Sequence, residues 1–332
     1  MSAQWMLYAL VVGVALTLAA LAGEQSARLR RRPARGMWAL AMVLTVALPL
    51  LVPPSQTRQP VAPDRRAAAQ LSAPARVAAV AAIGAGNWLP ARSSPTGTID
   101  IDQVVRPGWQ VSSALALLAL AGASLALQRR ARHWQRGTLA GKEVLVSVDA
   151  GPAVLGVLRP HIVVPAWLLR APAARQVLVI AHEQAHIDAG DQRLLAAMAL
   201  LLVAMPWNVP LWFQLRRLRL AIEVDCDARV LDQGHRVADY GAALIDIGSH
   251  ASSSLASALA PAMAESTGFL VQRVRLMTRR PARWHRFAAP VLLLMAIETG
   301  VAAARIPAPP QGAGTPVAVA VPQATREALA GY

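Results

Sequence analysis

Two histidines with a glutamate between them stand in the stretch VLVIAHEQAHIDAGD, residues 177–191. On a helix, residues four apart lie on one face, so His182 and His186 can both direct a ring nitrogen at one tetrahedral metal ion. Glu183 lies about 100° around the helix axis from His182, because an α-helix has 3.6 residues per turn. Its carboxylate can therefore take a proton from a bound water without being a ligand itself. This is the HExxH pattern of zinc peptidases, and it predicts Zn²⁺ as the cofactor.

A second helix offers a third ligand for the same ion, because a catalytic zinc typically takes three protein ligands and leaves a fourth position for water. In the segment LRLAIEVDCDARVL, residues 218–231, Glu223 and Asp227 are four apart and face the same way. Glu223 is the predicted third ligand, and Asp227 is predicted to accept the second ring N–H of a ligating histidine. The alternative is structural: the histidines are core residues bonded to backbone carbonyls, and the two acids belong to a solvated helix face.

The bulk composition indicates a membrane protein. Of the 332 residues, 55% are hydrophobic and only 15% are charged, and the mean hydropathy is +0.40, which is too apolar for an ordinary soluble protein. Arginine clusters flank the apolar runs on the side predicted to be cytoplasmic, and they supply the net charge of +15 without any groove-reading motif. Direct nucleic-acid binding is therefore not expected. Four apolar runs are predicted to cross the bilayer as helices, namely residues 5–22, 37–52, 109–127 and 287–304.

A fifth apolar segment, residues 194–213, is also long enough for a span. A crossing there would, however, leave His186 and Glu223 on opposite sides of the bilayer. We therefore interpret this segment as a buried core helix or a shallow dip into the membrane, broken by Pro206 and Pro210. The predicted order is residues 1–53 with the first two spans, an outer loop over 54–108, the third span over 109–127, a cytoplasmic domain over 128–286, the fourth span over 287–304 and an outer tail over 305–332.

The predicted cytoplasmic domain begins with two short strands, residues 143–149 and 158–165, which we expect to form a hairpin. The second strand is predicted to present an open edge that binds substrate in extended form through main-chain hydrogen bonds. The residues of this edge are His161, Ile162, Val163 and Val164. The helix with the HExxH pattern is predicted to end at Gly190, and the second motif helix is predicted to run over about 211–231.

Four stretches carry a further signal: LRPHIVVP (158–165), AHEQAHIDAGD (181–191), PWNVPLWF (206–213) and EVDCDARVL (223–231). Together with the order of the predicted spans, they resemble the zinc metallopeptidases of the BlaR/MecR type, which are membrane-bound antirepressors. The resemblance implies an α-helical membrane protein with four transmembrane helices and an inserted α+β, zincin-like cytoplasmic metallopeptidase domain. It also implies a place in the bacterial inner (cytoplasmic) membrane. For the site, it implies zinc on His182, His186 and Glu223. It implies that Glu183 activates the water.

The function implied by the resemblance is that of an integral-membrane zinc endopeptidase, a signal transducer that cleaves a cytoplasmic protein such as a transcriptional repressor, or itself. The expected partners are a protein substrate and the lipid bilayer, and a homodimer is left open. β-Lactam sensors of this family add an outer penicillin-binding domain with a reactive serine and a lysine three residues on, whereas the only lysine here is Lys142. The resemblance therefore implies the peptidase and not the antibiotic receptor.

Two other functions stay open at this point: a non-catalytic, zinc-containing membrane sensor or scaffold, and a membrane quality-control metalloprotease. The residues around Asp227 favour the antirepressor type over the second of these. No residue is assigned to stabilise the oxyanion, because Tyr240, His235 and His250 are equal candidates by chemistry alone.

Overall fold

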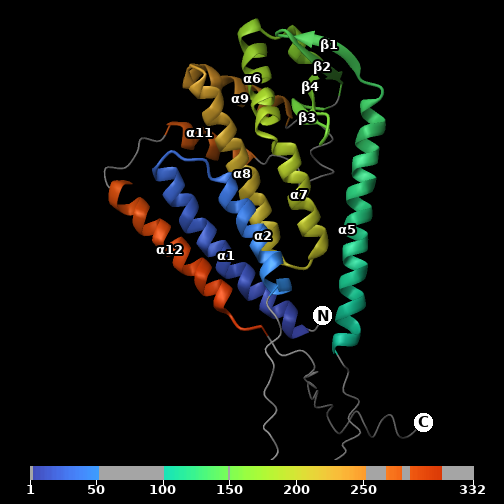
Figure 1. Ribbon diagram of the computed structural model, residues 1–332. Helices are drawn as coiled ribbons and strands as arrows, with labels where there is room; N and C mark the ends of the chain where they lie inside the picture. The colour runs from blue at the N-terminus through green and yellow to red at the C-terminus, as the bar shows by residue number, and fades with distance from the viewer. Residues whose placement is uncertain (1–2, 52–100, 149, 252–266, 279–284, 309–332) are drawn as a thin grey trace, which may run out of the picture. The chain divides into compact units, whose positions relative to one another are not determined.

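The computed structural model describes residues 3–51, 101–148, 150–251, 267–278 and 285–308. The chain divides into two compact units, and the elements around the site belong to the unit formed by residues 6–52 and 108–306. The described residues are mostly helical, with a small four-stranded sheet among the helices (Figure 1). The mainly helical character predicted from the sequence is thereby confirmed.

Three helices in the described part of the chain are long and apolar enough to cross a membrane: α1 (Ala3–Leu29), α5 (Ile101–Ala131) and α12 (His285–Arg305). They contain the first, third and fourth predicted spans. The second predicted span corresponds to α2 (Arg35–Leu51), which is apolar but has only 17 residues. A helix of that length extends about 25 Å, less than the hydrocarbon thickness of about 30 Å. The arrangement with four spans, and the side on which each segment lies, stay predictions.

The outer segment predicted over residues 54–108 includes the start of a helix. Helix α5 already begins at Ile101, so residues 101–108 are helical. Asp102 in the first turn favours a helix start there, because acidic side chains stabilise the positive end of a helix. Residues 54–100 lie outside the described residues, and so do residues 309–332 of the predicted outer tail.

The four strands are β1 (Gln135–Leu139), β2 (Lys142–Ser147), β3 (Ala153–Leu155) and β4 (His161–Pro165), in the order β1-β2-β4-β3. The hairpin predicted between the second and the fourth of them is wrong, because β2 and β4 are parallel neighbours. Parallel strands cannot be joined by a tight turn, and the chain between them instead forms β3, which pairs antiparallel with β4. Strand β4 is therefore bonded on both sides. Ile162 and Val163 are paired on both sides, whereas His161 pairs only with β3 and Val164 only with β2, so the open edge predicted over His161, Ile162, Val163 and Val164 is closed at its centre.

One face of the sheet packs on α6 (Ala173–Ala189), the helix with the HExxH pattern. Ile162 and Val164 are alternate residues of β4, so they point to the same face, where they are buried with Val179 and Ile180 of α6. Burial of a side chain of this kind contributes roughly 1.5–3 kcal/mol relative to exposure. The sheet thus fixes the rotation of α6, and with it the direction in which the histidines point.

The second motif helix packs beside α6. Gly190 ends α6 with a left-handed φ of 67°, and its N–H bonds the carbonyl oxygens of His186 and Ile187, which confirms the predicted helix end. Helix α7 (Asp191–Ala204) follows directly, and α8 (Val209–Asp232) begins after a break that contains Pro206. Because α7 has only 14 residues, it is too short to cross the bilayer and separate the motif helices. Helices α6, α7 and α8 contact one another, and α2 lies along α8 (Figure 1).

Gly156, in the loop between β3 and β4, is expected to resist substitution. Its φ of 99° lies in the left-handed region, and an added Cβ would lie 2.4 Å from the carbonyl oxygen of Arg159. We expect Gly156→Ala to lower the free energy of unfolding by about 1–3 kcal/mol, because of backbone strain and this clash. Gly151→Ala is the control, since a Cβ there meets nothing within 4 Å. Denaturant unfolding of the detergent-solubilised chain measures both, and equal stability of the two variants would contradict the expectation.

Candidate metal centre

The two histidines of α6 and Glu223 of α8 point at one another. The Nε2 atoms of His182 and His186 are 3.3 Å apart. Glu223 places Oε2 3.4 Å from the Nε2 of His182 and Oε1 3.6 Å from the Nε2 of His186. A tetrahedral ion with bonds of about 2.0–2.2 Å holds its ligand atoms about 3.3–3.6 Å apart, so these three side chains fit one such ion. The structure thus brings together the three residues that the sequence predicts as ligands.

A buried aspartate holds the other ring nitrogen of His186. Nδ1–H donates to Oδ2 of Asp191 over 2.9 Å, and Asp191 is only 2% exposed. Asp191 is the first residue of α7, and the left-handed turn at Gly190 brings it back beside His186. The bond fixes the orientation of the ring and directs Nε2 into the space between the ligands. Asp191 was not predicted as a site residue, although it follows Gly190 directly in the sequence, because its position beside His186 depends on the turn at Gly190.

The ring of His182 is held by a tyrosine. The hydroxyl of Tyr240, in α9 (Val237–Ala251), lies 2.8 Å from Nδ1 of His182 and donates to Oδ1 of Asp227 over 2.7 Å. Asp227 lies near His182 as predicted, but its Oδ1 is 3.8 Å from Nδ1, which is too far for a direct hydrogen bond. The predicted contact is therefore relayed through Tyr240. Tyr240 lines the cavity beside the cluster, but it is only 1% exposed and its hydroxyl is already bonded to His182 and Asp227.

Arg273 of α11 (Thr267–Thr278) is buried among the acids of α8. It donates to both carboxylate oxygens of Asp227, over 3.0 and 2.7 Å, and it pairs with Oε2 of Glu223 at 3.0 Å. The side chain is 3% exposed. One planar guanidinium thus orients both carboxylates, as the fork of an arginine allows. No sequence pattern connects Arg273 with Glu223, because only the packing of α11 on α8 brings them together.

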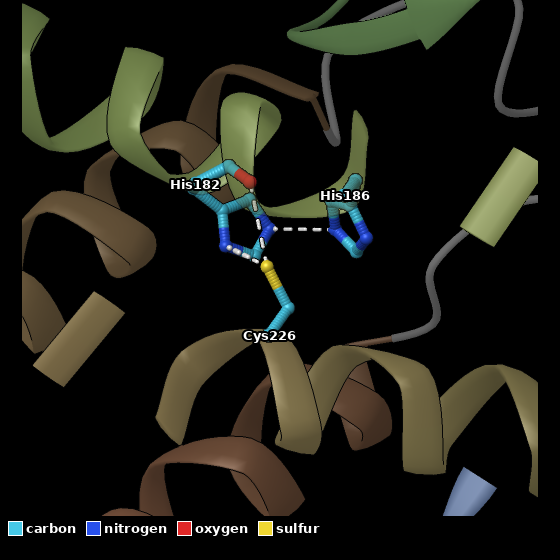
Figure 2. Close-up of side chains that lie close together, drawn as sticks. All are labelled: His182, His186 and Cys226. Carbon is cyan, nitrogen blue, oxygen red and sulfur yellow. Dashed lines mark hydrogen bonds between the residues drawn. The ribbon is translucent and has the colours of Figure 1, made fainter. Parts of the chain in front are cut away.

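Cys226 offers a different third donor. Figure 2 shows its side chain between α8 and the two histidines, and its Sγ lies 3.3 Å from Nδ1 of His182. His182, His186 and Cys226 place one donor atom each within 4.8 Å of the others, which is close enough to hold a metal ion. The sulfur, however, approaches the ring nitrogen that Tyr240 already bonds, and it lies 3.4 Å from the carbonyl oxygen of His182. The two donor sets share the histidines and differ only in the third ligand.

The side chains around the site hold protons on the histidines of the metal-free protein. Burial lowers the pKa of His186, but the hydrogen bond to Asp191 and the nearby Cys226 and Glu223 outweigh burial and raise this pKa to about 10. Burial also lowers the pKa of His182, yet its contacts with Cys226 and Glu223 bring it well above its usual range. Burial raises the pKa of Glu223, but the charge of Arg273 and the two histidines lower it overall. The cluster therefore favours cations at its centre.

The cluster opens into a cavity of about 680 Å³. Glu183 and Arg273 line this cavity beside the histidines, and Ala153 and Val154 of β3 form part of its wall. Glu183 is 6% exposed, and burial raises the pKa of its carboxyl. A carboxylate that is partly desolvated beside a metal centre is well suited to accept a proton. Glu183 thus lines the same cavity as the two histidines, and its role as general base stays a prediction.

The residues predicted to contact substrate lie one strand away from the cavity. The side chains of Ile162, Val163 and Val164 are buried in or behind the sheet, and the ring nitrogen Nδ1 of His161 lies 2.9 Å from the carbonyl oxygen of Arg159. The strand that reaches the cavity is β3. Strand β3 was not predicted from the sequence, because a strand of three residues is too short to show an alternating hydrophobic pattern.

A family model described as BlaR1 peptidase M56 matches residues 6–277 of the chain. The match includes α6, α8, α9 and most of α11, and hence every residue of the cluster described above. The resemblance to the BlaR/MecR type that the four sequence stretches indicate is thereby confirmed. No curated protein sequence matches the chain.

Metal binding to this cluster is expected to release protons. The pKa of His186 is about 10 and that of His182 is raised well above its usual range, so both rings of the metal-free protein hold a proton more tightly than a free histidine does. Each ring must lose its Nε2 proton before that nitrogen can bind an ion, so about two protons should leave per Zn²⁺ bound. Proton competition weakens as the pH rises, and the apparent affinity for Zn²⁺ should rise with it. Calorimetric titration in buffers of different ionisation enthalpy counts the protons, and an affinity independent of pH would contradict this account.

Proposed function

The chain belongs to the family of BlaR1 peptidases (M56), and we propose that it is an integral-membrane, zinc-dependent endopeptidase. The zinc ligands are His182, His186 and Glu223, and Glu183 is the general base. The observation that carries the proposal is the convergence of two imidazole nitrogens, 3.3 Å apart, on one carboxylate, whose Oε2 lies 3.4 Å from His182 and whose Oε1 lies 3.6 Å from His186. Membership of a membrane-associated metallopeptidase family supports the same class of reaction.

Glu223 suits the third ligand position better than Cys226. Its two oxygens face the two Nε2 atoms, whereas the sulfur of Cys226 approaches a nitrogen that is already bonded. Two histidines and one glutamate also form an established ligand set of hydrolytic zinc sites. Because imidazole and thiolate ligands select zinc as well, the proposed identity of the ion does not depend on this choice.

The proposed reaction is hydrolysis of a peptide bond. Zinc at these ligands would polarise the scissile carbonyl and lower the pKa of a bound water. Glu183 takes the proton from the attacking water and delivers it to the leaving amine. Asp191 and Tyr240 hold the two imidazole rings so that both Nε2 atoms face the site, and Arg273 holds the carboxylate of Glu223. Asp191, Tyr240 and Arg273 thus position the ligands, and Glu183 transfers the proton.

A protein substrate is proposed from the edge of the sheet. Within the described residues, β3 pairs with β4 alone, so its outer edge carries unpaired main-chain groups. Ala153 and Val154 of this strand line the cavity, and an extended peptide added to β3 would pass beside the ligand cluster. This assignment moves the proposed substrate contact from β4 to β3.

The proposed substrate is a cytoplasmic protein, such as a transcriptional repressor, or the chain itself. Basic residues at the last turns of α1 and α5, including Arg28 and Arg129, favour a cytoplasmic position for the ends of these helices. The site would then face the cytoplasm from the bacterial inner membrane, with the bilayer as the second partner and no role for nucleic acid. A homodimer is compatible with this arrangement and is not required by it.

Glu183→Gln is expected to keep its metal ion and to lose activity. The amide has the same shape as the carboxylate but cannot accept the proton, so cleavage should slow by about 10²–10⁴-fold. Protein fragments from membranes and cytosol of cells that express the parent or the variant measure the loss and identify the substrate. Metal content of the purified chains shows that the site is intact.

Glu143→Gln is the matched control, because Glu143 is exposed on β2 and does not line the cavity. It removes the same charge and should cleave like the parent. A metal-loaded Glu183→Gln chain that cleaves as fast as the parent would eliminate the proposed base. A metal-loaded parent that cleaves neither itself nor any other protein would favour the non-catalytic sensor or scaffold.

A further inference from the structure

The first residue of α2, Arg35, reaches from the turn between α1 and α2 into the metal centre. We propose that Arg35 is a positioning residue of the metal site, so that the α1–α2 hairpin, and not only the segment over 128–286, sets the geometry of the ligands. The inference rests on the proposed metal site. What is new is a physical connection between the α1–α2 hairpin and His186, one of the proposed ligands.

The connection consists of two consecutive bonds. Nη1 of Arg35 donates to Oδ1 of Asp191 and lies 3.4 Å from the carbonyl oxygen of Ala189. The other oxygen of Asp191, Oδ2, accepts the Nδ1–H of His186 over 2.9 Å. Arg35 therefore holds one oxygen of the carboxylate whose second oxygen orients the ring of His186.

The start of α2 is fixed to the helix that carries Glu223. The carboxylate of Asp225 accepts the backbone N–H of Ala34 over 3.2 Å and that of Arg35 over 3.1 Å. An acid in this position satisfies amide groups that have no partner inside a helix, and it stabilises the positive end of the helix. Asp225 is two residues from Glu223, so one turn of α8 contacts both α2 and the metal site. The guanidinium of Arg35 is thereby placed at a defined distance from both motif helices.

A second contact joins the same hairpin to α8. Glu24 of α1 is 1% exposed and pairs with Arg28 of its own helix and with Arg217 of α8. Breaking a buried ion pair leaves an uncompensated charge, which makes separation of the two helices unfavourable. The hairpin and α8 are thus joined at two points, by the ion pair of Glu24 with Arg217 and by the backbone hydrogen bonds to Asp225.

The balance of charge at Asp191 shows what Arg35 contributes. Asp191 is buried, and its two cations are Arg35 at Oδ1 and Arg229, which lies 3.3 Å from Oδ2. Without Arg35, Oδ1 loses its cation and both remaining donors compete for Oδ2. The carboxylate is then free to rotate toward Arg229, and the bond to His186 is weakened. Loss of such an outer contact typically reduces metal affinity 10–100-fold.

The test uses the full chain in detergent and measures its affinity for Zn²⁺ by competition with a chelator. Arg35→Gln is expected to weaken Zn²⁺ binding by about 10-fold or more. Arg32→Gln is the matched control, because Arg32 is exposed in the same turn and carries the same charge. It should bind Zn²⁺ like the parent. The visible spectrum of the Co²⁺-loaded chains, which reports ligand geometry, should change with Arg35→Gln and not with Arg32→Gln.

Asp191→Asn shows whether Arg35 acts through Asp191. If it does, the double variant Arg35→Gln/Asp191→Asn binds Zn²⁺ no more weakly than Asp191→Asn alone. Arg35→Lys replaces Arg35→Gln if the latter does not insert into membranes, and it should weaken binding in the same direction, because lysine lacks the planar fork of donors.

Equal Zn²⁺ affinities of Arg35→Gln and Arg32→Gln would overturn the inference. So would a double variant whose loss of Zn²⁺ binding free energy equals the sum of the losses from Arg35→Gln and Asp191→Asn. A parent chain that binds no Zn²⁺ would instead refute the proposed function itself. Failure of the inference about Arg35 and failure of the proposed zinc site therefore give different results.

Discussion

The structure depends on gathering carboxylates and imidazoles in one buried cluster in which Asp191, Glu223 and Asp227 are each paired with an arginine. Helix α8 shows how this is done, because three of its acids serve three different neighbours. Glu223 and Asp227 are four residues apart and share a face, where they meet the histidines and Arg273. Asp225 lies about 200° around the helix from Glu223 and binds the start of α2 instead. A buried carboxylate without a partner is unfavourable by several kcal/mol, so the arginines around the site are as necessary as the ligands.

The ligands and the groups that hold them come from different parts of the chain. His182, His186 and Glu223 lie on two helices in contact, whereas the groups that orient them belong to α7, α9 and α11. Two chains of bonds result, one from His186 through Asp191 and the other from His182 through Tyr240 to Asp227. Each chain fixes one imidazole in the tautomer that turns Nε2 toward its neighbours. The site is therefore a product of the packing of several helices.

This division explains which features the sequence could predict. The positions of His182, Glu183 and His186, and the end of their helix at Gly190, follow from a 3.6-residue period and a glycine cap. Glu223 follows from the same period on the second helix. Asp191, Tyr240 and Arg273 could not be found in this way, because a turn or long-range packing brings them to the site. The sheet order was mispredicted for a related reason: β1 is polar and β3 has three residues, so neither has a hydrophobic pattern.

The shortness of β3 has a consequence for selectivity. Three residues provide few main-chain groups, and each hydrogen bond contributes only roughly 0.5–1.5 kcal/mol net, so backbone pairing alone would retain a polypeptide weakly. A short edge also gives unrelated strands little to pair with, which limits edge-to-edge aggregation. For the proposed peptidase, selection between substrates would then depend on how substrate side chains fill the cavity beside the proposed ligands.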